Sequence, residues 1–154
     1  MRTRQQLMDE FRKSHMNPLN AVIHLICVPV IVFSSLGLAW CVPLGRWMGL
    51  APEIAPYVNL ATVAAPLLGL FYLQLSIGSL ITMTAWFAIS VVGILAIEAS
   101  GLSLFWTSAV LWVLSWAVQI YGHKVEGAKP SFADDLVFFL IGPLFVMDKL
   151  QGRR

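Results

Sequence analysis

Long apolar stretches alternate with short polar links along most of the chain. A helix needs roughly 20 apolar residues to cross a hydrocarbon core about 30 Å thick. Stretches that meet this requirement lie at residues 19–42, 58–76, 78–97 and 102–121. Because lipid offers the backbone no hydrogen-bond partners, each stretch is predicted to be an α-helix. The pattern therefore predicts about four transmembrane helices.

A fifth apolar piece, residues 136–147, is too short to span in a straight line, and Gly142-Pro143 interrupts it. It predicts a C-terminal interfacial or re-entrant helix over about residues 134–148, with a fifth span as the alternative. The link at residues 43–57 is rich in Pro and Gly and is predicted to be a loop. The links near Gly78 and Gly101 are short, so the second to fourth spans are expected to pack as antiparallel neighbours. We predict one all-α integral membrane domain over residues 1–154.

Composition excludes a water-soluble globule. Hydrophobic residues make up 58% of the chain and charged residues 12%, whereas soluble domains carry about 25% charged residues. Residues 1–18 are polar, so no cleavable signal peptide is expected there. Cys27 and Cys41 lie in apolar sequence and are interpreted as buried, inert thiols. No basic patch with interleaved aromatic residues suggests nucleic-acid binding.

The basic residues predict the orientation in the membrane. An even number of spans places both chain ends on one side, and cytoplasmic flanks are enriched in Lys and Arg. Basic residues cluster near the two ends, with only Arg46 between them: Arg2, Arg4, Arg12, Lys13, Lys124, Lys129, Lys149, Arg153 and Arg154. Both termini are therefore predicted to be cytoplasmic, at an inner membrane in a bacterium or at the endoplasmic reticulum in a eukaryote.

The three histidines of the chain, His15, His24 and His123, all fall at the predicted cytoplasmic ends of spans. Asn17 suits a helix N-cap and Pro18 the first helical position. Asn20 and His24 are then four residues apart on one helix face. Polar side chains at that depth usually face the interior of a bundle. This stripe predicts a polar site near the start of the first span.

A second polar stripe, Gln119, His123 and Glu126, ends the fourth span if its helix continues past Gly122. Imidazole nitrogens with a carboxylate suit iron or zinc, and two histidines with one carboxylate suit non-haem Fe(II) and oxygen chemistry. Alternatives remain for single residues: a plain helix cap for Asn17, an inter-helix hydrogen bond for Asn20, and a solvated charge for Glu126. Asp134 and Asp135 either cap the following helix or bind metal.

Three other functions compete with an oxygenase. In a non-catalytic helix-bundle module, the sole role of the two stripes would be to join two spans through hydrogen bonds. Intramembrane histidines also occur in carriers and proton relays. Against that function, no ionisable residue lies deep in the second or third span, so no polar path crosses the membrane core. A zinc-dependent lipid hydrolase could use the same histidines, and the identity of the metal would distinguish it from an oxygenase.

Two segments resemble a family of membrane proteins known as a domain of unknown function and typified by the fungal Fe(II)-dependent 2-hydroxy fatty acid (2-hydroxypalmitate) dioxygenase. The first is FRKSHMNPLNAVIHLICVPVIVFS, which matches the family in its two histidines, two asparagines and later proline. The second is WAVQIYGHKVEGAKPSFADDLVFFLIGPLF, which matches in Trp, Gln, Gly-His, Glu, Pro and a late Gly-Pro. The spans between these two segments match the family only in their apolar character.

The resemblance implies an Fe(II)-dependent dioxygenase of fatty acid alpha-oxidation, which uses dioxygen to remove one carbon of a 2-hydroxy fatty acid as carbon dioxide. It implies His15, His24 and His123 as metal ligands and Glu126 as the acidic residue of the site. Other polar residues are expected to bind the metal or to hold its ligands: Asn17, Asn20, Gln119 and Asp134. Lys124 or Lys129 is expected to neutralise the substrate carboxylate, so Lys124 and Glu126 are the predicted catalytic residues.

This chain departs from the family pattern at three positions. Phe11 stands where an aromatic hydroxyl is expected, Cys27 where a glycine is expected two residues before Pro29, and Ser131 in place of a small apolar residue. These positions affect packing at the cytoplasmic end of the bundle. They bear on the identity of the substrate more than on metal binding.

Overall fold

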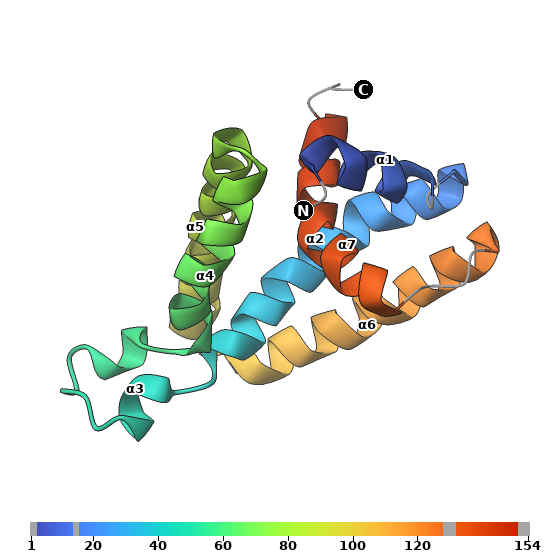
Figure 1. Cartoon of the computed structure of the whole chain (residues 1–154). Helices are drawn as coiled ribbons and strands as arrows, with labels where there is room; N and C mark the ends of the chain where they lie inside the picture. Colours follow the sequence, from blue (N-terminus) through green and yellow to red (C-terminus); the bar gives the residue numbers. More distant parts are fainter. Residues whose placement is uncertain (1–2, 14–15, 128–131, 151–154) are drawn as a thin grey trace. The chain divides into compact units, whose positions relative to one another are not determined.

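The computed structural model describes residues 3–13, 16–127 and 132–150, with side chains described at 3–12, 16–127 and 139–149 (Figure 1). These residues form helices and no strands, which confirms the predicted all-α class. The elements are α1 (Arg4–Lys13), α2 (Pro18–Trp40), α3 (Leu44–Trp47), the 3-10 helix η1 (Ala55–Tyr57), α4 (Leu60–Leu75), α5 (Ile77–Ala99), α6 (Leu104–Glu126) and α7 (Phe132–Leu150).

Three helical stretches in the described part of the chain are long and apolar enough to cross a membrane: Pro18–Trp47, Ile77–Ala99 and Leu104–Glu126. The predicted span at residues 58–76 is a shorter apolar helix, α4, of 16 residues. At 1.5 Å per residue it is about 24 Å long, less than the roughly 30 Å of a hydrocarbon core. The chain is therefore a helical membrane protein whose second predicted span, α4, is the shortest of the four.

The chain forms two compact units, Met1–Val32 with Trp112–Arg154 and Phe33–Leu111. Helices α2 and α6 contribute residues to both. The first unit carries the polar stripes that the sequence singled out. The second unit holds α3, η1, α4 and α5.

In the first unit, α1 packs against α7. Leu7, Met8 and Phe11 are buried along one face of α1. The guanidinium of Arg4 donates two hydrogen bonds, of 2.8 and 2.7 Å, to the carboxylate of Asp148. The segment predicted as an interfacial or re-entrant helix is α7, a single helix with Pro143 inside it. Its ribbon changes direction along its length (Figure 1), as expected for a helix that contains proline.

In the second unit, the link between α4 and α5 is short because one residue serves both helices. Ser76 ends α4 in an extended conformation, and its hydroxyl accepts a hydrogen bond from the Ser79 amide at the start of α5. The two helices then pack side by side, as the short link predicted. At the other end of α4, Asn59 and Thr62 form a reciprocal capping box, which fixes where this helix begins.

Candidate functional site

The structure brings His24 of α2 and His123 of α6 together. Their ring centroids lie 4.9 Å apart, with an angle of 85° between the ring planes. The side chain of His24 is buried, whereas His123 is partly exposed. Two residues that are about a hundred positions apart in the chain therefore share one site in the first unit.

A hydrogen bond within α2 fixes the ring of His24. Its Nδ1 lies 2.9 Å from the carbonyl oxygen of Asn20, one turn earlier. A carbonyl oxygen only accepts, so Nδ1 carries the proton and the lone pair of the neutral ring is on Nε2. Metal-binding histidines are commonly held in this way, with the second nitrogen bonded to a carbonyl or a carboxylate.

Glu126, at the end of α6, caps the start of α2. Its carboxylate accepts hydrogen bonds from the backbone amides of Met16, at 2.9 Å, and Asn17, at 3.0 Å, and from the side-chain amide of Asn20, at 2.9 Å. Amides at a helix N-terminus lack partners within the helix, and the helix dipole favours a negative charge there. Glu126 therefore ties the end of α6 to the beginning of α2.

Asn17 acts as a local cap as well. Its side-chain oxygen accepts a hydrogen bond of 2.9 Å from the amide of Leu19, and Pro18 occupies the first position of α2. This arrangement is the plain helix cap that the sequence left open for Asn17. The side chain of Asn17 therefore acts within α2, whereas the side chain of Asn20 donates a hydrogen bond to Glu126 of α6.

Gly122 allows α2 to approach α6 closely. A β-carbon at this position would lie 2.5 Å from Oδ1 of Asn20 and 3.3 Å from the side chain of Ile23, so a larger residue cannot fit without displacement. Asn20 is completely buried. Sequence reasoning treated Gly122 only as a point where the helix could stop, and the close contact depends on the partner helix.

Two buried amide oxygens at this site, Oδ1 of Asn20 and Oε1 of Gln119, have no hydrogen-bond partner among the described residues. Gln119 is four residues before His123 in α6 and is largely buried. Leaving such a group without a partner costs about 1 to 3 kcal/mol. Buried polar groups normally have a hydrogen-bond partner, and a bound ion would provide one for these two oxygens.

Phe11 of α1 packs against the site. Its ring lies edge-on to His24, with centroids 6.2 Å apart. It also contacts the ring of Phe145 of α7, with centroids 4.6 Å apart and the ring planes tilted by 44°. The phenyl group is almost fully buried. The helix α1 is absent from the sequence-based prediction, although Leu7, Met8 and Phe11 have the i, i+1, i+4 spacing of an amphipathic helix.

Not every predicted site residue can be placed. His15, Lys129 and the side chain of Asp134 lie outside the described residues. Lys124 follows His123 directly and is exposed. Within the described part of the chain, no group of three or more His, Cys, Asp or Glu side chains is arranged to hold a metal ion. The described site therefore offers two imidazoles and two amide oxygens.

The spacing of the two imidazoles is compatible with one shared metal ion. A histidine nitrogen lies about 2.1 Å from a bound metal, so two rings on one ion have centroids roughly 4.5 to 5.3 Å apart. The 4.9 Å between His24 and His123 falls within this range. With the tautomer of His24 fixed and two amide oxygens without partners, the donor set fits a metal that accepts nitrogen and oxygen ligands.

The chain resembles known proteins over its whole length. The family described as "2-hydroxy-palmitic acid dioxygenase Mpo1-like" matches residues 1–154. The 2-hydroxy-palmitic acid dioxygenase MPO1 of Saccharomyces cerevisiae is 29% identical over 135 residues, which cover 86% of this chain and 71% of the yeast protein. No solved structure matches.

Proposed function

Because the chain belongs to the Mpo1-like family of 2-hydroxy-palmitic acid dioxygenases, we propose that it is an Fe(II)-dependent dioxygenase that shortens 2-hydroxy fatty acids by one carbon. The name of the yeast relative supports this substrate class. The observation that carries the proposal is the pair His24 and His123, with centroids 4.9 Å apart and Nδ1 of His24 bonded to the carbonyl of Asn20.

The proposed ligands are His24 and His123, joined by His15 from the segment between α1 and α2. The unpartnered oxygens of Asn20 and Gln119 either complete the ligand set or bind water on the metal. Iron, when bound, would supply open positions for the 2-hydroxy-carboxylate group and for dioxygen.

The overall reaction balances without a further reductant. A 2-hydroxy acid, R–CH(OH)–COOH, and one dioxygen give the acid R–COOH, carbon dioxide and water. The bond between the carboxyl carbon and the hydroxyl-bearing carbon breaks, and the four electrons that reduce dioxygen come from the substrate. The proposed reaction therefore consumes no external reductant, and the role left to the protein is to position the substrate.

The residues around the histidines have distinct proposed roles. Lys124, exposed beside His123, attracts the substrate carboxylate at the cytoplasmic membrane surface. Glu126 and Asn20 hold the ends of α2 and α6 together, so that both imidazoles keep their positions. Both carboxylate oxygens of Glu126 accept hydrogen bonds from α2 and the residues before it. We therefore propose that Glu126 positions the two histidines. Direct contact between Glu126 and the substrate stays a prediction. Phe11 covers His24 and limits access of water.

The test is metal content and turnover of the detergent-purified protein, reconstituted with Fe(II) in the absence of oxygen. About one iron per chain is expected in the wild type, with a large loss in His24→Ala and His123→Ala. Carboxyl-labelled 2-hydroxypalmitic acid should then release labelled carbon dioxide when oxygen is admitted. Gln74→Ala, on an exposed position of α4, is the control that should retain both properties.

Three other results would overturn the proposal. Stoichiometric zinc that supports hydrolysis of a lipid ester would indicate a hydrolase. A well-folded protein that binds no metal would indicate a bundle in which the polar stripes only join helices. Iron without release of carbon dioxide from any 2-hydroxy acid would separate the metal site from the proposed reaction.

A further inference from the structure

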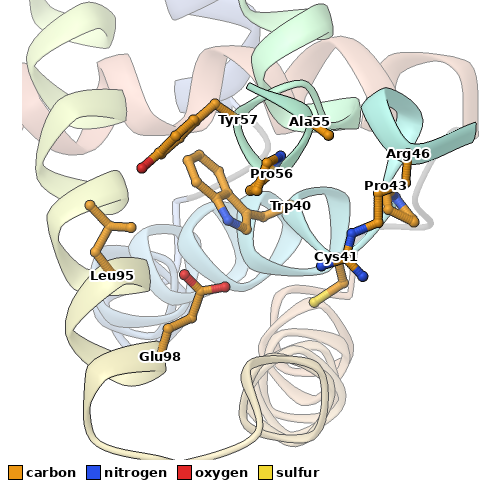
Figure 2. Close-up of a pocket in the computed structure, with 9 residues that line it drawn as sticks. All are labelled: Trp40, Cys41, Pro43, Arg46, Ala55, Pro56, Tyr57, Leu95 and Glu98. Atoms are coloured by element: carbon orange, nitrogen blue, oxygen red, sulfur yellow. The ribbon is translucent and has the colours of Figure 1, made fainter. Parts of the chain in front are cut away.

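A second site lies in the other unit, where α2 ends. A cavity of about 350 Å³ opens between the end of α2, the segment of α3 and η1, and the last turns of α5 (Figure 2). Trp40, Arg46, Pro56, Tyr57, Leu95 and Glu98 are among the residues that line it. None of the residues proposed to bind iron belongs to this cavity.

The cavity contains one positive and one negative side chain that do not pair. Within the described residues, neither the guanidinium of Arg46 nor the carboxylate of Glu98 has a hydrogen-bond or ion-pair partner. Both residues are exposed, because a buried charge without a partner would cost much free energy. Two opposite charges that line one cavity without contacting each other suit a ligand that carries both signs.

Aromatic and apolar surface separates the two charges. Figure 2 shows the indole of Trp40 in the middle of the cavity, with the carboxylate of Glu98 turned toward it. The faces of Trp and Tyr rings attract cations such as ligand ammonium groups. An ammonium group between Glu98, Trp40 and Tyr57 would therefore be favoured by a carboxylate and by ring faces together.

An exposed apolar track leads away from the cavity along α5. Leu95 belongs to the lining, and Val92 and Ile89 follow at intervals of three residues toward the start of the helix. All three side chains are exposed, Ile89 and Val92 by about two thirds. In a helix of membrane-spanning length, such a track faces lipid and can hold an acyl chain.

The wall formed by α3 and η1 is held in place by backbone contacts. The Gly45 amide donates a 2.6 Å hydrogen bond to the carbonyl of Val58. A β-carbon at Gly45 would lie 2.5 Å from the carbonyl oxygen of Ala55, so only glycine fits there. The hydroxyl of Thr62 donates a 2.7 Å hydrogen bond to the carbonyl of Tyr57. The cavity is thus built by α3 and η1 before any ligand binds.

We propose that this cavity binds the zwitterionic head group of an amine-bearing phospholipid. The phosphate lies at Arg46, since guanidinium groups bind phosphate strongly. The ammonium lies at Glu98 and the faces of Trp40 and Tyr57, and one acyl chain follows Leu95, Val92 and Ile89. The site is at the end of a spanning helix, where head groups are found. This inference is independent of the proposed dioxygenase reaction.

A free fatty acid fits the cavity less well, because its single carboxylate would gain Arg46 and be repelled by Glu98. A phospholipid that bears only negative charge has the same disadvantage. The charge pattern therefore predicts selectivity for phosphatidylethanolamine over phosphatidylglycerol, and this selectivity depends on Glu98.

The test is lipid binding to the full-length protein in detergent, measured by native mass spectrometry with added phosphatidylethanolamine, phosphatidylglycerol or palmitate. The wild type should bind phosphatidylethanolamine roughly tenfold more tightly than phosphatidylglycerol. Arg46→Gln should weaken both phospholipids by roughly tenfold. Glu98→Gln should remove the preference between them. Glu53→Gln, exposed in the same loop but outside the cavity, should behave as the wild type.

Several outcomes would overturn the inference. The first is equal binding of the two phospholipids to the wild type, and the second is wild-type behaviour of Arg46→Gln and Glu98→Gln. Tighter binding of palmitate, lost in Arg46→Gln, would make this a fatty-acid site. Glycerophosphoethanolamine lacks acyl chains, and if it bound as tightly as the lipid it would identify a soluble metabolite as the ligand. Circular dichroism of each variant separates loss of binding from loss of folding.

Discussion

The carboxylate of Glu126 accepts a 2.9 Å hydrogen bond from the side-chain amide of Asn20, across the interface between α6 and α2. The same Asn20 gives its backbone carbonyl to Nδ1 of His24. Glu126 is the last residue of α6 and lies three positions after His123. One short network therefore connects the imidazole of His24, which contacts His123, to the cap of α2, and the site depends on a contact between residues far apart in sequence.

Glu126→Gln should destabilise the protein by about 1.5 to 3 kcal/mol, the usual contribution of hydrogen bonds to a charged group. A neutral amide accepts fewer hydrogen bonds and loses the interaction with the dipole of α2. Thermal unfolding in detergent measures the effect. Glu53→Gln, at an exposed position between α3 and η1, is the control for loss of one negative charge. Unchanged unfolding and unchanged metal content in Glu126→Gln would contradict the capping role.

Gly122→Ala should disturb the site, because the added β-carbon would lie 2.5 Å from Oδ1 of Asn20. The expected result is a lower unfolding temperature and loss of bound iron. Gly69→Ala in α4 is the matched control, because its β-carbon would meet only Leu80 at 3.7 Å. This control should stabilise its helix by up to about 1 kcal/mol. Equal behaviour of the two variants would show that α2 and α6 do not pack closely at Gly122.

Much of this organisation could be predicted from local sequence. The apolar stretches predicted the main helices, and Asn17 with Pro18 predicted where α2 begins. Both signals act over a few residues, where spacing and capping chemistry decide the outcome. The short link near Gly78 likewise predicted the pairing of α4 with α5.

The rest depends on contacts that spacing does not encode. The fit of Asn20 against Gly122 and the cover that Phe11 forms over His24 both require the partner helix to be in place. Helix α1 was missed because residues 1–18 were considered only as a polar flank, although its apolar spacing was present. The cavity beside Trp40 was missed because Arg46 and Glu98 are more than fifty residues apart and each looks like an ordinary surface charge.

Arg4 and Asp148 should couple α1 to α7. A double-mutant cycle with Arg4→Ala and Asp148→Ala is expected to give a coupling free energy of about 1 kcal/mol, because the pair has two charge-assisted hydrogen bonds but remains partly exposed. The pair Arg12 and Asp9, 3.7 Å apart and more exposed, is the internal control and should give less than about 0.5 kcal/mol.

Release of α1 would also expose the site. Faster hydrogen exchange in α1, and faster loss of iron to a chelator, are expected in the Arg4→Ala variant, since Phe11 would no longer cover His24. Equal coupling for the two ion pairs, or unchanged iron loss, would mean that the contact with Asp148 does not hold α1 in place.

Gln119→Leu distinguishes a metal site from a purely structural stripe. In the described part of the chain, Oε1 of Gln119 is buried without a partner. An apolar residue of similar size removes that unsatisfied group, so the metal-free protein should be as stable as the wild type or more stable. Iron binding and carbon dioxide release should fall, by roughly 10- to 100-fold if Gln119 holds a ligand in place. Gln74→Leu, on an exposed position of α4, should change neither. Lower stability of Gln119→Leu with unchanged iron binding and turnover would contradict this role. Gln119 would then serve to join helices, as expected for a non-catalytic helix-bundle module rather than for a dioxygenase.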